Sequence, residues 1–341
     1  MKLDMNRMLI ETAIRRALQG METSPERSIR NLIDLGLNFS QGELQQKLLH
    51  TAKDMLRDQN SAYYALLKDT LVHVDMEKLI TLGMDLGYNS CTKGAAAIRQ
   101  LEAQQGFNIP WLLSMAVNCA SLPDRADDYA QILAQGTDLG IYTYACFPDG
   151  DPPPLLPHLR AQRSCAFFLL LPSGQLTEEL TAELKQLDNV LTAVQADQDA
   201  PAACARLRAE KLPFAVWRRY GQADQADSLS GHWLEDLLPG HPLFALLLPE
   251  VGCPAETRSA VCAYLHTLRV AQKTPVIPME LLQDGLMIDE IISNNGCLVG
   301  FDQAGELYTH DGPCPHSGVN LFRTPLEDIL RRVQTMREAK P

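Results

Sequence analysis

A regular alternation in the second part of the chain restricts its fold more than any other feature of the sequence. From Trp111 onward, short apolar runs alternate with amphipathic helical stretches, and six runs are present, at residues 111–118, 141–147, 165–171, 190–196, 213–219 and 242–248. Short and almost continuously apolar runs are typical of parallel strands that are buried on both faces under covering helices. The alternation therefore predicts an α/β fold with six strand–helix units.

Two arrangements of the sheet fit this alternation. In an open doubly wound sheet the strand order reverses at a switch point, whereas in a (β/α) barrel each strand lies beside the one before it. The six units follow one another without a signal for a reversal, which favours a partial (β/α)6 TIM-like barrel. A sheet whose strands are not in sequential order would instead indicate an unrelated α/β protein.

The first 105 residues have a different texture and predict a helical region. Ser24 before Pro25 is a typical start of a helix, with a hydroxyl N-cap ahead of a proline. Further helices are expected over residues 61–72 and 94–105. The segment 87–95 between them, GYNSCTKGA, is rich in turn-forming residues, so we expect it to be irregular.

The end of the chain returns to mixed structure. The sequence DQAG at residues 302–305 predicts the turn of a hairpin, and Thr324-Pro325 predicts the start of a last helix. We therefore expect three parts, which are an N-terminal helical region over 1–105, the barrel over 106–275 and a small C-terminal hairpin and helix extension over 276–341.

Charge and apolar content exclude several classes of partner. The 341 residues carry a net charge of −12, with basic residues scattered along helices, so nucleic acid is not expected as a partner. The longest apolar run, residues 166–172, is too short for a membrane helix, and the N-terminus lacks the pattern of a signal peptide. Nine cysteines, an odd number without a CxxC pair, indicate that most of the thiols are reduced and buried. We expect a cytoplasmic protein that binds no membrane.

Several stretches resemble the barrel of radical S-adenosylmethionine (radical SAM) proteins. They are FNIPWLLSMAV at 107–117, AQGTDLGIYTYACFPDGDP at 134–152 and RAEKLPFAVW at 208–217. The tail at 296–330, which begins GCLVGFDQAGELYTHDGPCPHSG, resembles the SPASM extension of that superfamily. The resemblance covers about residues 105–335 and implies a partial barrel with an extension.

The resemblance also identifies a missing element. In radical SAM enzymes a C-x3-C-x2-C loop after the first strand holds three irons of a four-iron cluster. Here the first strand ends near Asn118, the next helix begins near Leu122, and only Cys119 lies between them. One thiolate cannot hold such a cluster, so the sequence indicates a degenerate form with no cofactor at the barrel.

A second family motif is altered at the end of the second strand. The family has a Gly-Gly-Glu-Pro type of turn whose backbone meets the methionine part of the cofactor, and this chain has Asp149, Gly150 and Asp151 followed by proline. Asp149 replaces a glycine and would crowd that approach. With Arg218 and Glu250, which end two later strands, these residues are the candidate ligand-binding groups at the mouth of the barrel.

The tail contains four candidate metal ligands. Cys297, His310, Cys314 and His316 carry soft or borderline donor atoms, and three of them could come from one loop. The spacing is not that of a standard zinc motif, and a rigid polar loop explains the prolines at 313 and 315 equally well. A metal or an iron–sulfur cluster in the extension is therefore one interpretation of the tail.

Two functions of different classes follow. The first is a catalytically inactive barrel that acts as a binding or partner module for a peptide, a small ligand or an active relative. The second is an enzyme of changed chemistry that uses an acidic pocket at the mouth of the barrel, with a metal in the extension. The second predicts that titratable groups converge in one pocket and that at least one has a perturbed pKa.

Overall fold

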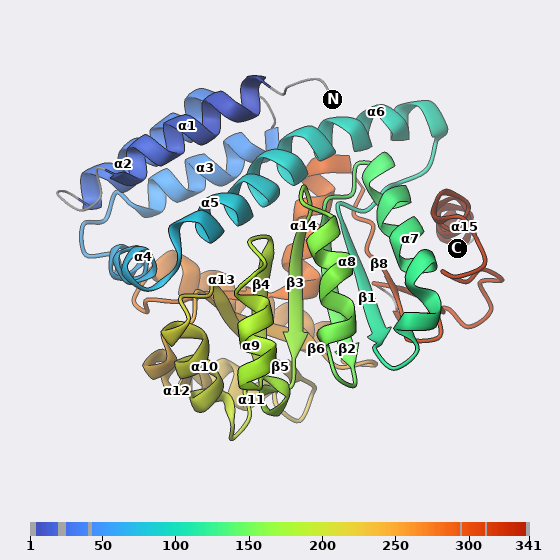
Figure 1. Ribbon diagram of the computed structural model, residues 1–341. Coiled ribbons are helices and arrows are strands. Elements are labelled where there is room, and N and C mark those ends of the chain that lie inside the picture. Colours follow the sequence, from blue (N-terminus) through green and yellow to red (C-terminus); the bar gives the residue numbers. More distant parts are fainter. Residues whose placement is uncertain (1–4, 20–24, 40–42, 294, 311, 339–341) are drawn as a thin grey trace.

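The computed structural model describes residues 5–19, 25–39, 43–293, 295–310 and 312–338. A curled, open sheet forms the centre, helices cover its outer face, and a helical layer built from the N-terminal residues covers one end (Figure 1). Within the described residues, no helix is long and apolar enough to cross a membrane.

Ten strands form one sheet in the order β10-β9-β8-β1-β2-β3-β4-β5-β6-β7. The strands β1 to β7 are parallel and sequential, β8 pairs parallel with the free side of β1, and β9 and β10 continue antiparallel. The strand bounds are β1 Leu112–Asn118, β2 Thr143–Asp149, β3 Ala166–Leu171, β4 Val190–Gln195, β5 Phe214–Tyr220, β6 Phe244–Pro249, β7 Ile277–Glu280, β8 Val299–Phe301, β9 Leu307–Thr309 and β10 Gly312–Pro313.

The first six strands coincide with the six apolar runs, and their sequential order confirms the barrel arrangement over a doubly wound sheet. The strand number differs from the predicted (β/α)6, because β7, β8, β9 and β10 also join the sheet. The sequence of β7, IPME, has no apolar run that could reveal it. The hairpin is confirmed, since β8 and β9 pair around residues 302–305. A Cβ at Gly300 would meet the Cβ of Ser114 at 3.2 Å, so glycine allows β8 to approach β1 closely.

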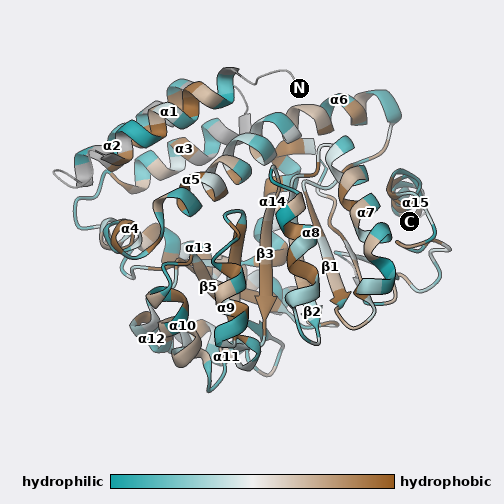
Figure 2. Cartoon of the chain, in the orientation of Figure 1, coloured by the Kyte–Doolittle hydropathy of each residue, from teal (hydrophilic) through white to brown (hydrophobic). Residues whose placement is uncertain are grey.

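Helices follow the strands along the outer face of the sheet. Their bounds are α7 Ala126–Asp138, α8 Leu156–Ala161, α9 Glu178–Leu184, α10 Ala200–Ala209, α11 Gln225–Ser230, α12 His232–Leu237, α13 Ala255–Ala271, α14 Leu281–Ser293 and α15 Leu326–Glu338, with short 3₁₀ turns η3 Leu122–Arg125, η4 Pro153–Leu155, η5 Ser173–Gln175 and η6 Leu238–Gly240. Apolar residues concentrate on the strands and on the inner helix faces (Figure 2).

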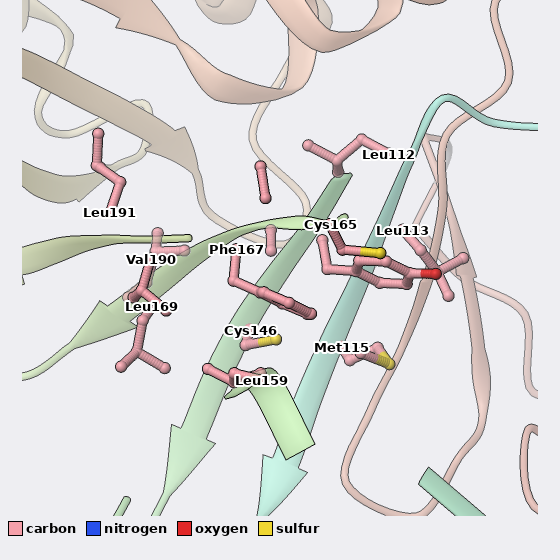
Figure 3. Close-up of a cluster of buried hydrophobic side chains, with 14 of the residues drawn as sticks. Leu112, Leu113, Met115, Cys146, Leu159, Cys165, Phe167, Leu169, Val190 and Leu191 are labelled. Atoms are coloured by element: carbon pink, nitrogen blue, oxygen red, sulfur yellow. The ribbon is translucent and has the colours of Figure 1, made fainter. Parts of the chain in front are cut away.

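The main core lies between the sheet and these helices. Side chains of β1 to β4 and of α8 meet there in one layer, among them Met115, Cys146, Cys165, Phe167 and Leu159 (Figure 3). The two cysteines are fully buried and reduced, which confirms their interpretation as small apolar core residues.

The N-terminal layer contains α1 Met5–Gln19, α2 Pro25–Phe39, α3 Glu43–Met55, α4 Ala62–His73, α5 Met76–Met84, the π-helix η2 Asp85–Gly94 and α6 Ala95–Gln105. The predicted helices that begin near residues 25, 61 and 94 are confirmed. Ser24 lies outside the described residues, so its role as an N-cap remains a prediction.

The expectation that residues 87–95 are irregular is wrong. They form most of the π-helix that joins α5 and α6 into one long helix. Polar residues of the π-helix form hydrogen bonds with one another and with the barrel. The Asn89 amide donates to the Asp85 carboxylate in the π-helix and to the carbonyl of Ser164, directly before β3. A Cβ at Gly94 would lie 2.5 Å from the carbonyl oxygen of Gly140. Turn-forming residues are thus used here for close packing against the sheet.

The α5–η2–α6 helix crosses the end of the sheet where the strands begin (Figure 1). Lys78 of α5 is 4% exposed and donates to the carbonyls of Lys185 and Leu187, and Arg99 of α6 donates to the carbonyl of Ile292 on α14. Because the N-terminal ends of the strands are covered in this way, the carboxyl ends and the concave face remain for a ligand.

Candidate functional site

An open cavity of about 440 Å³ lies on the concave face of the curled sheet. Residues of β1, β2, β5, β6, β8 and β9 line it, together with the segment that leads into α13 and the start of α14. The cavity is therefore lined by the first strands of the barrel, by its later strands β5 and β6, and by the C-terminal hairpin.

The alternation of side chains along each strand decides which residues line the cavity. On β1, Ser114 and Ala116 are partly exposed and line it, while Leu113, Met115 and Val117 are buried in the core behind the sheet. The small residues of β1 leave space on this wall of the cavity.

Aromatic side chains line the cavity on the strands on both sides of β1. Phe147 of β2 lies beside Ala116 in the register, and its ring meets Trp217 of β5 edge-on, with 6.3 Å between the ring centroids. Phe301 and Tyr308 of the hairpin also line the cavity. The cavity is thus apolar along its sheet wall.

Four charged side chains and one histidine also line the cavity, and they are Arg219, Glu250, Arg258, Asp302 and His310. The Arg219 guanidinium lies over the Trp217 ring at 5.8 Å from its centroid. Within the described part of the chain, no ion pair within 4.0 Å involves Arg219 or Arg258. Two arginines without a carboxylate partner therefore line one cavity.

The carboxylates at the cavity are used in different ways. Asp302 accepts the backbone N–H groups of Ala304 and Glu306 at 2.9 and 2.8 Å, which fixes the turn of the hairpin. Glu250 is exposed after β6 and lies close to Gly221, where a Cβ would be 2.6 Å from its Oε2 atom. Glu250 is therefore an exposed acidic side chain that lines the cavity, and its role in binding a ligand stays a prediction.

Arg218 lies elsewhere than expected. Its guanidinium donates to the Asp227 carboxylate at 2.6 Å and lies over the Trp233 ring on the outer side of β5, so it does not line the cavity. Arg219, one position later, lines the cavity instead. The sequence could have predicted this difference, because the side chains of neighbouring strand residues point to opposite faces of a sheet and only one of the two arginines can face the cavity. The expected position of Arg218 in the mouth is corrected for this reason.

Asp149, Gly150 and Asp151 form a separate group at the end of β2, outside the lining of the cavity. The Cys119 backbone N–H donates to the carbonyl of Asp149 at 3.0 Å. Burial, with a further contribution from the charges of Asp149 and Asp151, raises the pKa of the Cys119 thiol to about 11. Gly150 has a φ of +87°, a conformation that favours glycine. At neutral pH Cys119 is therefore a protonated thiol beside two carboxylates.

The four candidate metal ligands of the tail are dispersed. Cys297 is 2% exposed in the core, and burial raises its pKa to about 12, whereas His310 lines the cavity and His316 is exposed. The Cys314 thiol contacts the Thr309 hydroxyl at 3.8 Å. In the part of the chain that the structure describes, no three His, Cys, Asp or Glu side chains form a group that could hold a metal.

Comparisons with known proteins define the class of fold. The sequence matches no protein family and no curated protein. Among solved structures, Streptococcus suis SuiB bound to the precursor peptide SuiA matches with a TM-score of 0.50 at 10% identity, over 69% of this chain and 67% of that chain. SuiB bound to S-adenosylmethionine matches with a TM-score of 0.49 at 11% identity, over 69% and 66% of the two chains.

A third structure, anSMEcpe with bound AdoMet, matches with a TM-score of 0.45 at 10% identity, over 66% of this chain and 82% of that chain. This chain spans about two thirds of the length of SuiB. The protein thus has an α/β half-barrel fold like that of SuiB. At this level of identity the likeness concerns the fold alone.

Proposed function

We propose that this protein is a binding module built on a radical SAM-like half-barrel, which takes a peptide or a small ligand into its concave cavity and performs no radical chemistry. The observation that carries this proposal is the combination of a formed cavity with unpaired arginines and a first loop that has one cysteine. A pocket with an apolar wall and a few convergent polar groups is the usual form of a ligand site.

The residues after β1 do not fit a four-iron cluster. Between β1 and the helix α7 lie Cys119, two further residues and the 3₁₀ turn η3, so the loop offers one thiol. That thiol is buried, and its raised pKa opposes the thiolate form that an iron ligand requires. These facts support a barrel without the cluster.

A peptide ligand is part of the proposal. SuiB has been crystallised with its precursor peptide SuiA, which is a property of that protein. In the present chain the cavity is open to solvent along the carboxyl ends of β5 and β6, and Val251 at its rim is 73% exposed. An open rim with an exposed apolar residue leaves room for a ligand longer than the cavity itself. An active relative as a partner remains a prediction.

The test is metal and sulfide analysis of protein purified without oxygen and reconstituted with iron and sulfide, followed by titration with S-adenosylmethionine. We expect no four-iron absorption and no cleavage of S-adenosylmethionine. As a control, Cys119→Ala should leave any residual iron content unchanged. Four irons per chain together with cofactor cleavage would show that the proposal is wrong.

An enzyme of changed chemistry is the second candidate, because Cys253, Glu250 and His310 line the same cavity. Burial raises the pKa of the Cys253 thiol, which weakens it as a nucleophile at neutral pH. Labelling by iodoacetamide distinguishes the two functions. Slow labelling of Cys253 at pH 7 agrees with the binding module, and rapid, selective labelling favours the enzyme.

The metal or cluster predicted for the tail is a separate question. Cys314→Ala should lower the metal content and the thermal stability if this loop holds a metal, because metal binding stabilises the folded state. Equal metal content and equal stability in the variant would leave the tail as a hairpin with a polar loop.

A further inference from the structure

We propose that the ligand of the concave cavity carries a carboxylate group, which Arg219 and Arg258 bind together, and an apolar body, which lies along the sheet wall. This inference rests on the proposed binding function and specifies the chemical class of its ligand. A free acid or the C-terminal residue of a peptide has both parts.

The two arginines reach the cavity from neighbouring strand–helix units. Arg219 is near the end of β5, opposite Leu248 of β6 in the register. The chain leaves β6, turns at residues 250–254 and enters α13, whose first turns carry Arg258 back to the same cavity. Guanidinium groups bind carboxylates through paired N–H donors, so two converging arginines suit this anion.

Arg258 has an unused donor that a ligand could satisfy. Its Nη1 atom makes a long hydrogen bond of 3.5 Å to the carbonyl of His310, and its Nε atom is buried without a partner. A buried N–H group without an acceptor costs free energy until an acceptor arrives. The neighbouring Thr257 is buried and donates to Gln225 at 3.0 Å, which holds the first turn of α13 in place.

Among the described residues, no acidic side chain near the two arginines forms an ion pair with them within 4.0 Å. Asp302 is turned into the hairpin by its two backbone hydrogen bonds. Glu280 is 1% exposed, accepts the Tyr220 hydroxyl at 2.8 Å and forms no ion pair with Arg258 within 4.0 Å. Burial raises the pKa of Glu280, against the opposing effects of the Gln283 N–H, the Tyr220 hydroxyl and the charge of Arg258. Glu250 lies at the rim beside Gly221, where it can accept an N–H group from the other end of the ligand.

The remaining lining defines the body of the ligand. Phe147, Leu248 and Leu282 present apolar surface to the same cavity as the two arginines. Burial of apolar surface against these side chains adds affinity, while the arginines fix the orientation of the acid group. A small hydrophilic anion could bind the two arginines but would leave the apolar lining without a contact.

The experiment compares N-acetylphenylalanine with its C-terminal amide, using the full chain and isothermal titration calorimetry at low ionic strength and pH 7. We expect the acid to bind about tenfold more tightly than the amide, because the amide cannot form charged hydrogen bonds to the arginines. Added salt should weaken binding of the acid more than binding of the amide. Arg219→Gln and Arg258→Gln should each reduce this preference.

Arg163→Gln is the matched control, since Arg163 is exposed ahead of β3 and away from the cavity, and this variant should keep the full preference. Thermal unfolding of each variant shows that the fold is retained. Equal affinity for acid and amide, an undiminished preference in both arginine variants, or no binding of the acid would each overturn the inference. Such a result leaves the iron and cofactor analysis unaffected, so failure of this inference is distinguishable from failure of the proposed function.

Discussion

The Asp289 carboxylate on α14 accepts the backbone N–H of Trp111 at 3.0 Å, directly before β1 begins. Its other oxygen accepts the backbone N–H of Cys297, ahead of β8. One side chain thus joins the starts of two paired strands to the same helix. Because β1 and β8 form one wall of the cavity, this buried carboxylate positions that wall.

Asp289→Leu should destabilise the fold by about 2–4 kcal/mol, because it leaves two buried backbone N–H groups without an acceptor. The measurement is urea unfolding at pH 7, with the free energy obtained by linear extrapolation. Glu290→Leu on the same helix is the control, since this side chain is exposed and should change stability by well under about 1 kcal/mol. Equal effects of the two substitutions would contradict this role of Asp289.

Asp85 should make stability depend on pH. Burial raises its pKa from 3.8 to about 7, against the opposing effects of Arg7 at 3.6 Å and the Asn89 hydrogen bond. The folded state therefore holds a proton that the unfolded chain releases. Between about pH 4 and 7 this group's contribution to the free energy of unfolding falls as pH rises.

Asp85→Asn removes this titration and keeps the shape of the side chain. Relative to the variant, the wild type should lose stability as pH rises from about 4 to 7, by at most about 1.4 kcal/mol for each unit of the pKa shift. Chemical unfolding of both proteins at several pH values gives the difference. Parallel stability curves for the two proteins would show that Asp85 does not titrate in this range.

Lys78 should be essential for attaching the N-terminal helical layer. Its ammonium donates to the carbonyls of Lys185 and Leu187, which follow α9, and to the Asp188 carboxylate at 3.0 Å. Lys78→Met should cost about 2–4 kcal/mol and raise hydrogen exchange in α5 before exchange in the central strands. Lys185→Met is the control, because its ion pair with Glu210 is largely exposed and should contribute less than about 1 kcal/mol.

Gly94→Ala should disturb the contact between the π-helix and the sheet. The new methyl group would lie 2.5 Å from the carbonyl oxygen of Gly140, so one of the two backbones must move. We expect a loss of about 2 kcal/mol or more in thermal or urea unfolding. Gly83→Ala has no atom within 4 Å and should be neutral or stabilising by about 0.5–1 kcal/mol. A neutral Gly94→Ala would show that the contact is adaptable.

The sequence predicted the parts of the fold that depend on local pattern. Six strands were visible because each is a continuous apolar run, and the hairpin was visible because its turn residues are specific. The strand β7 could not be predicted, since Pro278 and Glu280 interrupt its apolar character and tertiary contacts alone place it beside β6. The π-helix was missed because glycine, asparagine and serine also form turns.

The candidate site was only partly predictable for a different reason. Glu250 was found because it directly follows an apolar strand. Arg219 could have been found from the alternation that places Trp217 and Arg219 on one face of β5. Arg258 gave no signal, because it is one of many charged residues on a helix and only the return of α13 over β6 brings it to the cavity.

The π-helix between α5 and α6 fixes the rotation of one helix relative to the other. A residue deleted from Asp85–Gly94 would turn α6 by about 100° around its axis, since each residue of an α-helix advances by that angle. Arg99 would then face away from α14 while Lys78 kept its place on the barrel. The segment therefore tolerates changes of residue type better than changes of length, and deletions here should be more harmful than most substitutions.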